Sequence, residues 1–271
     1  MIIEYYSSSL LPVLTLVSAM ACGLVAQEVD VEADYRYGSL TWMQSSAEYR
    51  LLTEQTYRGA LHQLQVGLQD LHWSADEVQL STGGFQNMKP AVILDCDETV
   101  LDNSAYNARN IVDGKKYTTE SWNAWCQEGK AKSVPGALEF VKAAKGLGVS
   151  IYFITNRRDV VKDATIKNLK DLGFPASEET VLTKNADKGR GDDKLSRRAM
   201  VAKDHRIILL IGDSMGDLCS GMETLNSDER NELASEKQKM LGSRWIMLPN
   251  PVYGGWQRAL PEGQQSLRLS R

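Results

Sequence analysis

Short apolar runs that end abruptly in polar residues recur from about residue 90 onward. Runs of this kind, rich in β-branched residues, are typical of strands buried on both faces of a parallel sheet. The strands predicted in this way cover residues 91–94, 149–154, 181–182, 207–211 and 244–248. Helical patterns of about 10–15 residues separate most of them, which predicts βαβ units. The expected fold class is therefore α/β, with a Rossmann-like parallel sheet flanked by helices.

The helices between these strands are bounded by capping and breaking residues. Ser133 is a candidate cap for a helix that starts near residue 133 and that Gly148 ends, with Leu138, Val141 and Leu147 facing inward. Further helices are predicted at residues 159–172, 193–202 and 227–241. Their alternation with the strands supports the same fold class.

A helical pattern also precedes the first predicted strand. From residue 40 to residue 71, apolar positions recur at spacings of three and four, which predicts a stripe packed against the core. The stripe consists of Leu61, Leu64, Leu68 and Leu71. Residues 76–89 are polar and contain glycine, which predicts a link into the strand. We treat residues 40–89 as one N-terminal helical segment.

Residues 1–26 have the pattern of an export leader. The stretch 5–26 carries no charge, and its apolar centre is too short for a membrane span but suits a signal-peptide core. Ala19-Met20-Ala21 offers a small-x-small cleavage site before Cys22. Export is the expectation, with either lipidation of Cys22 or simple secretion. The acidic stretch 27–39 is expected to be a tether, and residues 261–271 a tail.

Charge and cysteine content exclude some classes of protein. The net charge of the 271-residue chain is −4 at pH 7, so no global charge favours a nucleic-acid partner. Four cysteines are too few and too scattered for a disulfide scaffold or a zinc site. Cys96 is expected to be a small apolar filler. Cys126 and Cys219 are expected to be buried free thiols, with a disulfide between them as the alternative.

Polar side chains follow the predicted strands where each strand ends. Asp95 and Asp97 follow the first, Thr155 the second, and Asp213 and Asp217 the strand at residues 207–211. Ligands bind at the carboxyl edge of open α/β sheets, so these side chains are candidates for one site. Carboxylates that meet there repel unless a cation lies between them, and oxygen ligands suit Mg²⁺. Taken alone, the first Asp pair could equally be an acidic, solvated turn.

An Asp pair, a Thr, a Lys and a second Asp pair follow one another in this order, and the order resembles the four motifs of the haloacid dehalogenase superfamily. The match is closest to the class C bacterial acid phosphatases, the outer-membrane lipoprotein type that acts on 5′-nucleotides. Residues 42–49, 95–103 and 248–256 carry the resemblance. It implies a small helical cap, formed by the N-terminal segment and an insert at about 104–132, over a phosphatase core at 90–260.

The resemblance implies catalytic roles for three of these residues. Asp95 would be the nucleophile that forms an aspartyl-phosphate. Asp97 would be the general acid that protonates the leaving oxygen and the general base that then activates water. Lys194 would neutralise the charge of the phosphoryl oxygens, with Lys184 and Lys188 as competing candidates.

The same resemblance implies Mg²⁺ as the cofactor. Its ligands would be the side chains of Asp95, Asp213 and Asp217, the last directly or through a water, and the backbone carbonyl of Asp97. Ser214 stands where the family commonly has Asn, a difference next to the ligands rather than among them.

Substrate contacts are implied for both polar and aromatic residues. The Thr155 hydroxyl would bind a phosphate oxygen, and Asn156 would be a substrate-binding residue. In the family, rings at the positions of Tyr253 and Trp256 sandwich a nucleobase together with a tryptophan of the cap. Such stacking is available to every base. For Trp256, a packed aromatic in a Gly/Pro turn is an equal alternative.

The insert at 104–132 is rich in aromatic residues. By its place in the resemblance, Trp122 is the base-stacking ring of the cap, with a place in the cap's own core as the alternative. Tyr117 and Trp125 are expected in that core.

The function that follows is an exported, Mg²⁺-dependent acid phosphatase, periplasmic or anchored in the outer membrane. Its expected partners are small phosphomonoesters, with 5′-nucleotides as the first candidates. Contact with the membrane is expected only through a lipid anchor on Cys22. The resemblance also allows for a homodimer. Two alternatives stay open. A phosphotransferase would use the same residues, and a catalytically silent storage or surface relative would be expected to lack the nucleophile, whereas Asp95 is present.

Overall fold

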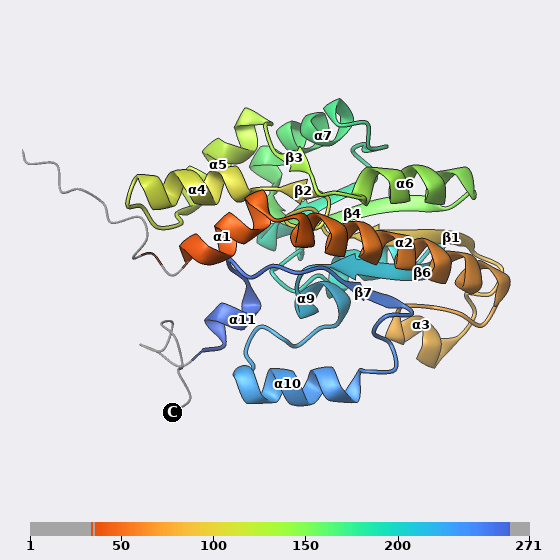
Figure 1. Cartoon of the computed structure of the whole chain (residues 1–271). Coiled ribbons are helices and arrows are strands. Elements are labelled where there is room, and N and C mark those ends of the chain that lie inside the picture. Colours follow the sequence, from red (N-terminus) through yellow and green to blue (C-terminus); the bar gives the residue numbers. More distant parts are fainter. Residues whose placement is uncertain (1–33, 35, 261–271) are drawn as a thin grey trace, which may run out of the picture.

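The computed structural model describes residue 34 and residues 36–260 (Figure 1). Five parallel strands form the central sheet in the order β5-β4-β1-β6-β7. The strands are β1 (Lys89–Leu94), β4 (Ser150–Arg158), β5 (Val181–Lys184), β6 (His205–Gly212) and β7 (Trp245–Met247). The predicted α/β class and parallel sheet are confirmed. Because β1 is central and the chain leaves it in both directions, a topological switch point lies at its carboxyl end.

Helices cover both faces of the sheet (Figure 1). Successive residues of β1 face opposite sides, so that Val92 and Leu94 join one apolar cluster and Ala91 and Ile93 join the other. The first cluster is covered by α2 (Ala47–Gln69), α6 (Ala137–Gly146) and α7 (Lys162–Asp171). The second is covered by α8 (Leu195–Ala202), α9 (Met215–Leu218) and α10 (Ser227–Glu236), and α3 (Glu77–Thr82) lies next to α8, where Gln79 Nε2 donates to the Ala202 carbonyl. Burial on both faces explains the continuous apolar runs of the strands.

A smaller helical layer lies beside the carboxyl ends of the strands (Figure 1). It contains α1 (Arg36–Ser45), α4 (Ser104–Val112), α5 (Thr119–Glu128) and the hairpin of β2 (Leu101–Asp102) with β3 (Lys132–Ser133). Leu40 and Met43 of α1 pack against Ile111 of α4. The N-terminal segment therefore divides, since α1 packs on the insert whereas α2 lies on the sheet. The short helices η2 (Asp159–Val161), η3 (Ala186–Lys188) and α11 (Gly255–Arg258) complete the chain.

The helical pattern at residues 40–71 is two helices rather than one. Ser46 interrupts it, and its Oγ caps α2 by accepting a hydrogen bond from the Tyr49 backbone N–H at 3.0 Å. The first helix begins at Arg36, inside the stretch 27–39 that was predicted as a tether. The apolar periodicity continues across Ser46, so the sequence pattern does not reveal the break between the two helices.

Two local predictions near helix starts are wrong. The stretch 76–89, predicted as a link, contains α3, which Asp76 caps by accepting a hydrogen bond from the Gln79 backbone N–H at 2.9 Å. Ser133 does not cap a helix, because it pairs with Leu101 in the small hairpin and α6 starts only after Gly136. Capping residues also occur in turns and strand ends, so their presence alone does not locate a helix.

Two leucines predicted to face the core are exposed. Leu71 lies two residues after the end of α2, and Leu147 is the cap residue after α6. Leu64 and Val141, inside those helices, are fully buried as predicted. The apolar stripe holds only while the chain stays helical, and the two exposed leucines lie beyond that point. The helix predicted at 227–241 likewise ends at Glu236.

The cysteines in the described part of the chain are buried free thiols, as predicted for Cys96, Cys126 and Cys219. Cys126 and Cys219 belong to different apolar clusters, so the alternative of a disulfide between them is wrong. The predicted leader at 1–26 with Cys22, most of the predicted tether and the tail at 261–271 lie outside the described residues. Among the helices that are described, none is both long and apolar enough to cross a lipid bilayer.

Candidate active site

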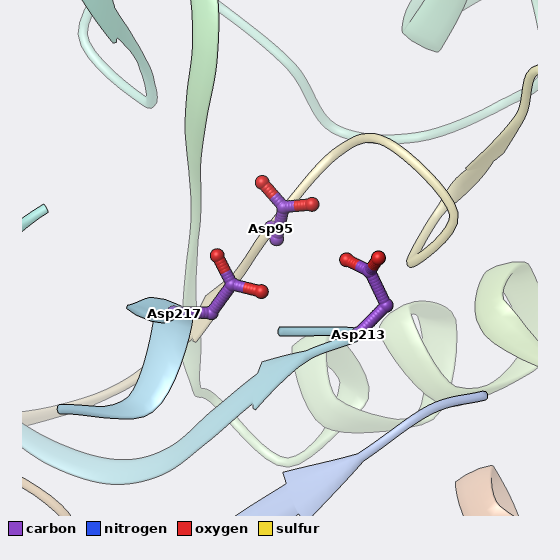
Figure 2. A group of neighbouring side chains, drawn as sticks. All are labelled: Asp95, Asp213 and Asp217. Carbon is purple, nitrogen blue, oxygen red and sulfur yellow. The ribbon is translucent and has the colours of Figure 1, made fainter. Parts of the chain in front are cut away.

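Three aspartates that follow two neighbouring strands meet at the carboxyl edge of the sheet (Figure 2). Asp95 directly follows β1, Asp213 directly follows β6, and Asp217 lies in α9. Because Leu94 pairs with Ile211 in the parallel ladder, the residues that follow these two strands emerge side by side. One carboxylate oxygen from each aspartate lies within 4.8 Å of the others. The structure thus brings together three of the predicted metal ligands, which we call the acid triad.

The turn after β6 fixes two members of the acid triad. The Ser214 backbone N–H donates a hydrogen bond to Asp217 Oδ2 at 2.9 Å, and Asn250 Nδ2 donates to Asp213 Oδ2 at 2.8 Å. Gly212 makes the turn possible, because a Cβ atom at this position would collide with the Asp217 carboxylate. Ser214 therefore fixes a metal-ligand candidate through its backbone, whatever its side chain. Asn250 is a residue of this site that the sequence did not single out.

Lys194 is the cation of the acid triad. Its ammonium forms ion pairs with Asp95 and, at 2.6 Å, with Asp217 Oδ1, and its side chain is only 6 % exposed. The two competing lysines, Lys184 and Lys188, pair with other aspartates away from the triad. Of the three candidates, the structure therefore places Lys194 beside Asp95.

One ammonium does not balance three buried carboxylates. Burial is the main cause that raises the pKa of Asp95 to about 7; the charges of Asp217 and Asp97 contribute to the rise and Lys194 opposes it. Burial also raises the pKa of Asp213, and Asp217 and Asp95 add to this effect. For Lys194, burial alone would lower the pKa, but the two carboxylates outweigh it and raise the pKa. A buried site with excess negative charge and only oxygen donors fits a hard divalent cation.

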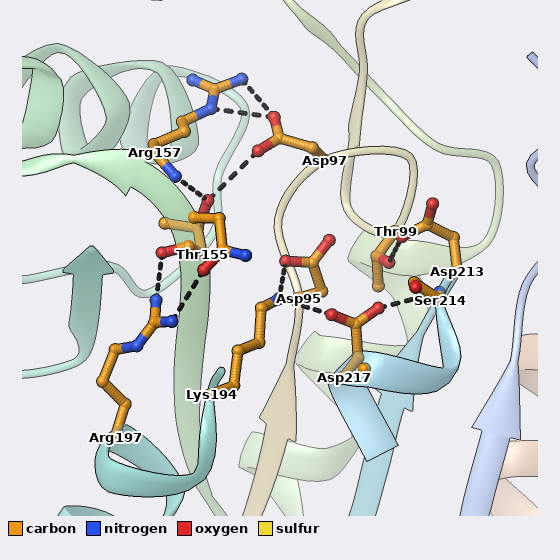
Figure 3. Close-up of polar contacts among 12 residues, drawn as sticks. Asp95, Asp97, Thr99, Thr155, Arg157, Lys194, Arg197, Asp213, Ser214 and Asp217 are labelled. Atoms are coloured by element: carbon orange, nitrogen blue, oxygen red, sulfur yellow. Dashed lines mark hydrogen bonds and ion pairs between the residues drawn. The ribbon is translucent and has the colours of Figure 1, made fainter. Parts of the chain in front are cut away.

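Asp97 belongs to a second group of side chains, turned toward Arg157 and Thr155 (Figure 3). Thr155 Oγ1 donates a hydrogen bond to Asp97 Oδ2 at 3.1 Å. Arg157 Nε donates to Asp97 Oδ1 at 2.9 Å, and Asn103 Nδ2 donates to the same oxygen at 3.0 Å. The sequence analysis missed Arg157 and Asn103. Arg157 lies two residues after Thr155 in β4, so strand alternation would have placed both side chains on one face.

Asn156, predicted to bind substrate, is held by the loop that leads to Lys194. Its Oδ1 accepts a hydrogen bond from Arg197 Nη2 at 2.7 Å, and its Nδ2 donates to the Asp192 carbonyl at 3.0 Å. Arg197 also donates to the Thr155 carbonyl, at 2.5 Å. Asn156 and the buried Arg197 therefore fasten the end of β4 to the start of α8. This arrangement fixes Thr155 and Lys194 relative to each other.

The aromatic residues of the insert have different surroundings. Trp122 packs edge-on against Tyr106, with ring centroids 5.1 Å apart, and the Arg157 guanidinium lies 5.5 Å from its ring centre. Trp125 is buried as predicted, and its Nε1 donates to Asn103 Oδ1 at 2.8 Å. The prediction that Tyr117 lies in the core is wrong, because 60 % of it is exposed in the loop between α4 and α5.

The two aromatic residues near the C-terminus lie beside the residues that hold Asp213. Tyr253 packs against the cluster that joins α1 to α4. Trp256 is 40 % exposed, and its indole N–H donates to the Asn250 carbonyl at 3.1 Å. Because Asn250 also binds Asp213, the exposed ring of Trp256 is connected to the acid triad through a single residue.

Comparisons with known proteins agree with this geometry. A family model of the HAD superfamily, subfamily IIIB acid phosphatases, matches residues 9–256. Among curated proteins, the chain is similar to the stem 28 kDa glycoprotein of Glycine max, 25% identical over 61% of this chain and 60% of that protein. It is also similar to acid phosphatase 1 of Solanum lycopersicum, 24% identical over 59% and 57%, and to vegetative storage protein 1 of Arabidopsis thaliana, 26% identical over 59% and 54%. The matches span less than two thirds of the length of each of these relatives.

Solved structures give a longer match. The class C acid phosphatase from Bacillus anthracis is 32% identical and superposes with a TM-score of 0.71, over 83% of this chain and 87% of that one. A second structure of that enzyme, with tungstate bound, is also 32% identical and has a TM-score of 0.69 over the same shares of the two chains.

Proposed function

The chain belongs to the acid phosphatases of HAD superfamily subfamily IIIB, and on this premise we propose that it hydrolyses phosphomonoesters with Mg²⁺ through an aspartyl-phosphate intermediate. One observation carries the proposal. The buried carboxylate of Asp95 is held by the Lys194 ammonium inside the acid triad, and the end of β4 holds Thr155 next to Asp97. A nucleophile, a cation and an acid–base carboxylate are the groups that phosphoryl transfer to a carboxylate needs.

The first half-reaction transfers the phosphoryl group to the protein. An oxygen of Asp95 forms a bond to phosphorus, the ester P–O bond breaks, and its electron pair goes to the leaving oxygen. Asp97 gives that oxygen a proton. Lys194 balances the charge of the phosphoryl oxygens, and the Thr155 hydroxyl, which donates to Asp97 Oδ2 in the structure, rotates to donate its hydrogen bond to one of them.

The second half-reaction returns Asp95 to its starting state. A water loses its proton to Asp97 while its oxygen forms a bond to phosphorus, and the bond between phosphorus and Asp95 breaks to release inorganic phosphate. Asp95, Asp213 and Asp217, together with the backbone carbonyl of Asp97, would hold Mg²⁺. The bound ion supplies further charge neutralisation for the phosphoryl oxygens.

Tungstate in the similar Bacillus anthracis structure supports the phosphate site. Tungstate is an oxyanion of phosphate-like shape, and that enzyme shares the fold at 32% identity. The groups that would hold such an anion here are Lys194 and Thr155, both at the carboxyl edge of the sheet.

We propose 5′-nucleotides as the preferred phosphomonoesters. The support comes from the aromatic residues, since the exposed ring of Trp256, Tyr253 and the cap residue Trp122 all lie beside groups that contact the site. Aromatic rings stack on any nucleobase, which gives affinity without base selection. Trp256→Ala should therefore raise the KM for AMP while leaving the KM for p-nitrophenyl phosphate unchanged.

A storage role is the second candidate function. It is favoured by the similarity to vegetative storage protein 1 of Arabidopsis thaliana. Asp95, Lys194 and the acid triad are all present and assembled, which supports turnover rather than storage. A phosphotransferase would use the same residues, and it differs only in that an added alcohol would compete with water for the phosphoryl group.

Export is also part of the proposal. It rests on the uncharged apolar stretch at residues 5–26 and on Cys22 after Ala19-Met20-Ala21. Fractionation of cells that express the full chain and its Cys22→Ser variant tests it. A membrane-bound wild type with a soluble, exported variant supports a lipid anchor, whereas export of both in soluble form supports simple secretion. Light scattering on the same protein tests the expected homodimer.

The decisive experiment is phosphate release from AMP and p-nitrophenyl phosphate at several pH values by the chain without residues 1–26. Release that EDTA abolishes, that Mg²⁺ restores and that Asp95→Asn loses supports the proposal. Asp171→Asn, which changes an exposed aspartate paired with Lys167, is the matched control and should behave like the wild type. Folded protein that releases phosphate from neither substrate would favour the storage role.

A further inference from the structure

The two oxygens of Asp97 are bound very differently. Oδ1 accepts from Arg157 Nε at 2.9 Å and from Asn103 Nδ2 at 3.0 Å, and Arg157 Nη2 lies 2.8 Å from it. Within residues 36–260, the one hydrogen bond to Oδ2 comes from Thr155 Oγ1, at 3.1 Å. An oxygen that already faces three N–H donors has no room for a proton of its own. Oδ2 is therefore the less restrained of the two oxygens, and it lies next to the Thr155 hydroxyl.

Arg157 is held rigidly enough to maintain this difference. It is 1 % exposed, its Nη1 donates to Thr165 Oγ1 at 3.3 Å, and its Nη2 donates to Asn103 Oδ1 at 3.1 Å. The Trp122 ring lies over the guanidinium. A planar guanidinium fixed at both ends presents two N–H groups in one direction, which a lysine cannot do.

Asn103 is oriented by a residue of the insert. Its Oδ1 accepts from Trp125 Nε1 at 2.8 Å and from Arg157 Nη2, and both of these groups can only donate. The amide nitrogen must therefore face Asp97. The amide nitrogen also lies 3.3 Å from Glu98 Oε2, which favours the same orientation. Trp125, from α5, makes the shortest of the hydrogen bonds that hold the Asn103 side chain with its nitrogen toward Asp97.

We propose that Arg157, Asn103 and Trp125 are positioning residues that hold Oδ1 of Asp97 and leave Oδ2 as the oxygen turned toward the reacting groups. This inference rests on the proposed phosphatase function. In the step concerned, Asp95 forms its bond to phosphorus and the ester P–O bond breaks. The leaving oxygen keeps the electron pair and takes the proton from Asp97 Oδ2. The new carboxylate charge of Asp97 then faces the Arg157 guanidinium.

The inference predicts a dependence on the leaving group. An alkoxide, such as the 5′-oxygen of AMP, is a poor leaving group and needs the proton as the ester bond breaks. p-Nitrophenolate is a stable anion and leaves without it. The ratio of the two kcat/KM values reports on this proton, because kcat/KM covers only the steps up to the first irreversible one and excludes hydrolysis of the aspartyl-phosphate.

Two variants and one matched control test this. Trp125→Phe removes a single indole N–H, and Arg157→Lys keeps the charge but loses the planar pair of donors. Trp245→Phe is the control, because its indole is equally buried and donates to the Ala75 carbonyl at 2.8 Å on the far side of the sheet. A well-positioned acid contributes about 10²–10⁴-fold to a rate. We expect Trp125→Phe to lower kcat/KM for AMP about tenfold and Arg157→Lys about 100-fold.

With p-nitrophenyl phosphate, the kcat/KM of both variants should stay within about threefold of the wild-type value. Trp245→Phe should leave the ratio of the kcat/KM values for the two substrates unchanged. Equal losses on both substrates, or no loss in Trp125→Phe, would overturn the inference. If Arg157→Lys does not fold, Trp125→Phe alone decides. A folded wild type that releases phosphate from neither substrate would instead overturn the proposed function, and this inference with it.

Discussion

Replacing Asp95, the proposed nucleophile, should make the metal-free protein more stable. Asp95→Asn leaves the shape of the side chain but removes one of three buried negative charges around Lys194. Burial raises the pKa of Asp95 to about 7, from an ordinary value of 3.8. The folded chain therefore binds the Asp95 proton more tightly than the unfolded chain does, and ionisation of this group costs stability.

The size of the effect follows from the two pKa values. At pH 7.5 the ionised Asp95 lowers the free energy of unfolding by about 4 kcal/mol, because each pKa unit corresponds to about 1.4 kcal/mol. This cost is absent below the unfolded pKa, grows as the pH rises from about 4 to about 7, and is constant above that. Asparagine does not ionise, so the Asp95→Asn variant does not carry this free-energy cost. In EDTA, Asp95→Asn should gain about 4 kcal/mol at pH 7.5, or roughly 8–16 °C in Tm, and about 1 kcal/mol at pH 4.5.

Urea denaturation in EDTA at the two pH values measures these differences. Asp97→Asn is the matched control, because it makes the same chemical change two residues away with the opposite expected sign. It leaves the buried Arg157 without its carboxylate and should cost about 3 kcal/mol. An Asp95→Asn variant that is less stable than the wild type at pH 7.5, or a gain of equal size at both pH values, would refute the reasoning.

Three further predictions concern the surroundings of the acid triad. Lys194→Met should abolish phosphate release and lower the free energy of unfolding in EDTA by about 3 kcal/mol, since it leaves buried carboxylates unpaired. Normal activity of this variant would show that Lys194 has no role in the site. Lys167→Met, at an exposed lysine, is the control. Asn250→Ala should raise the Mg²⁺ concentration for half-activation about 10- to 100-fold, because Asp213 loses its hydrogen bond; an unchanged Mg²⁺ titration would contradict this. Gly212→Ala should cost about 1–3 kcal/mol in urea denaturation, because its Cβ collides with Asp217, and wild-type stability would show that the turn can adjust.

The sequence predicted the sheet well because its signal is local. Each strand is a short apolar run buried on both faces, and Asp95 and Asp213 follow such runs directly. The carboxyl edge of a parallel sheet then brings the two aspartates together without further information. The choice of Lys194 came from the resemblance, and local pattern alone did not distinguish it from Lys184 or Lys188.

The groups around Asp97 could not be predicted in the same way. Arg157 is 60 residues from Asp97 along the chain, and Trp125 is 22 residues from Asn103. A buried arginine and an exposed one have the same local sequence pattern, so only the fold reveals the pairing. The prediction for Tyr117 is wrong for a related reason. An aromatic residue close in sequence to a buried cluster need not belong to that cluster, and the loop between α4 and α5 exposes Tyr117.

The central place of β1 has a consequence for how the protein becomes active. Ribosomes make Asp95 well before the strands that flank it, and contacts such as Trp245 to Ala75 join residues 170 positions apart. Contacts between such distant parts of a chain form late and slow the folding. A chain that stalls or is cut before β6 carries Asp95 without Asp213 and Asp217. Such fragments should be inert, so hydrolytic activity should arise only in the final stage of folding, once nearly the whole chain is present.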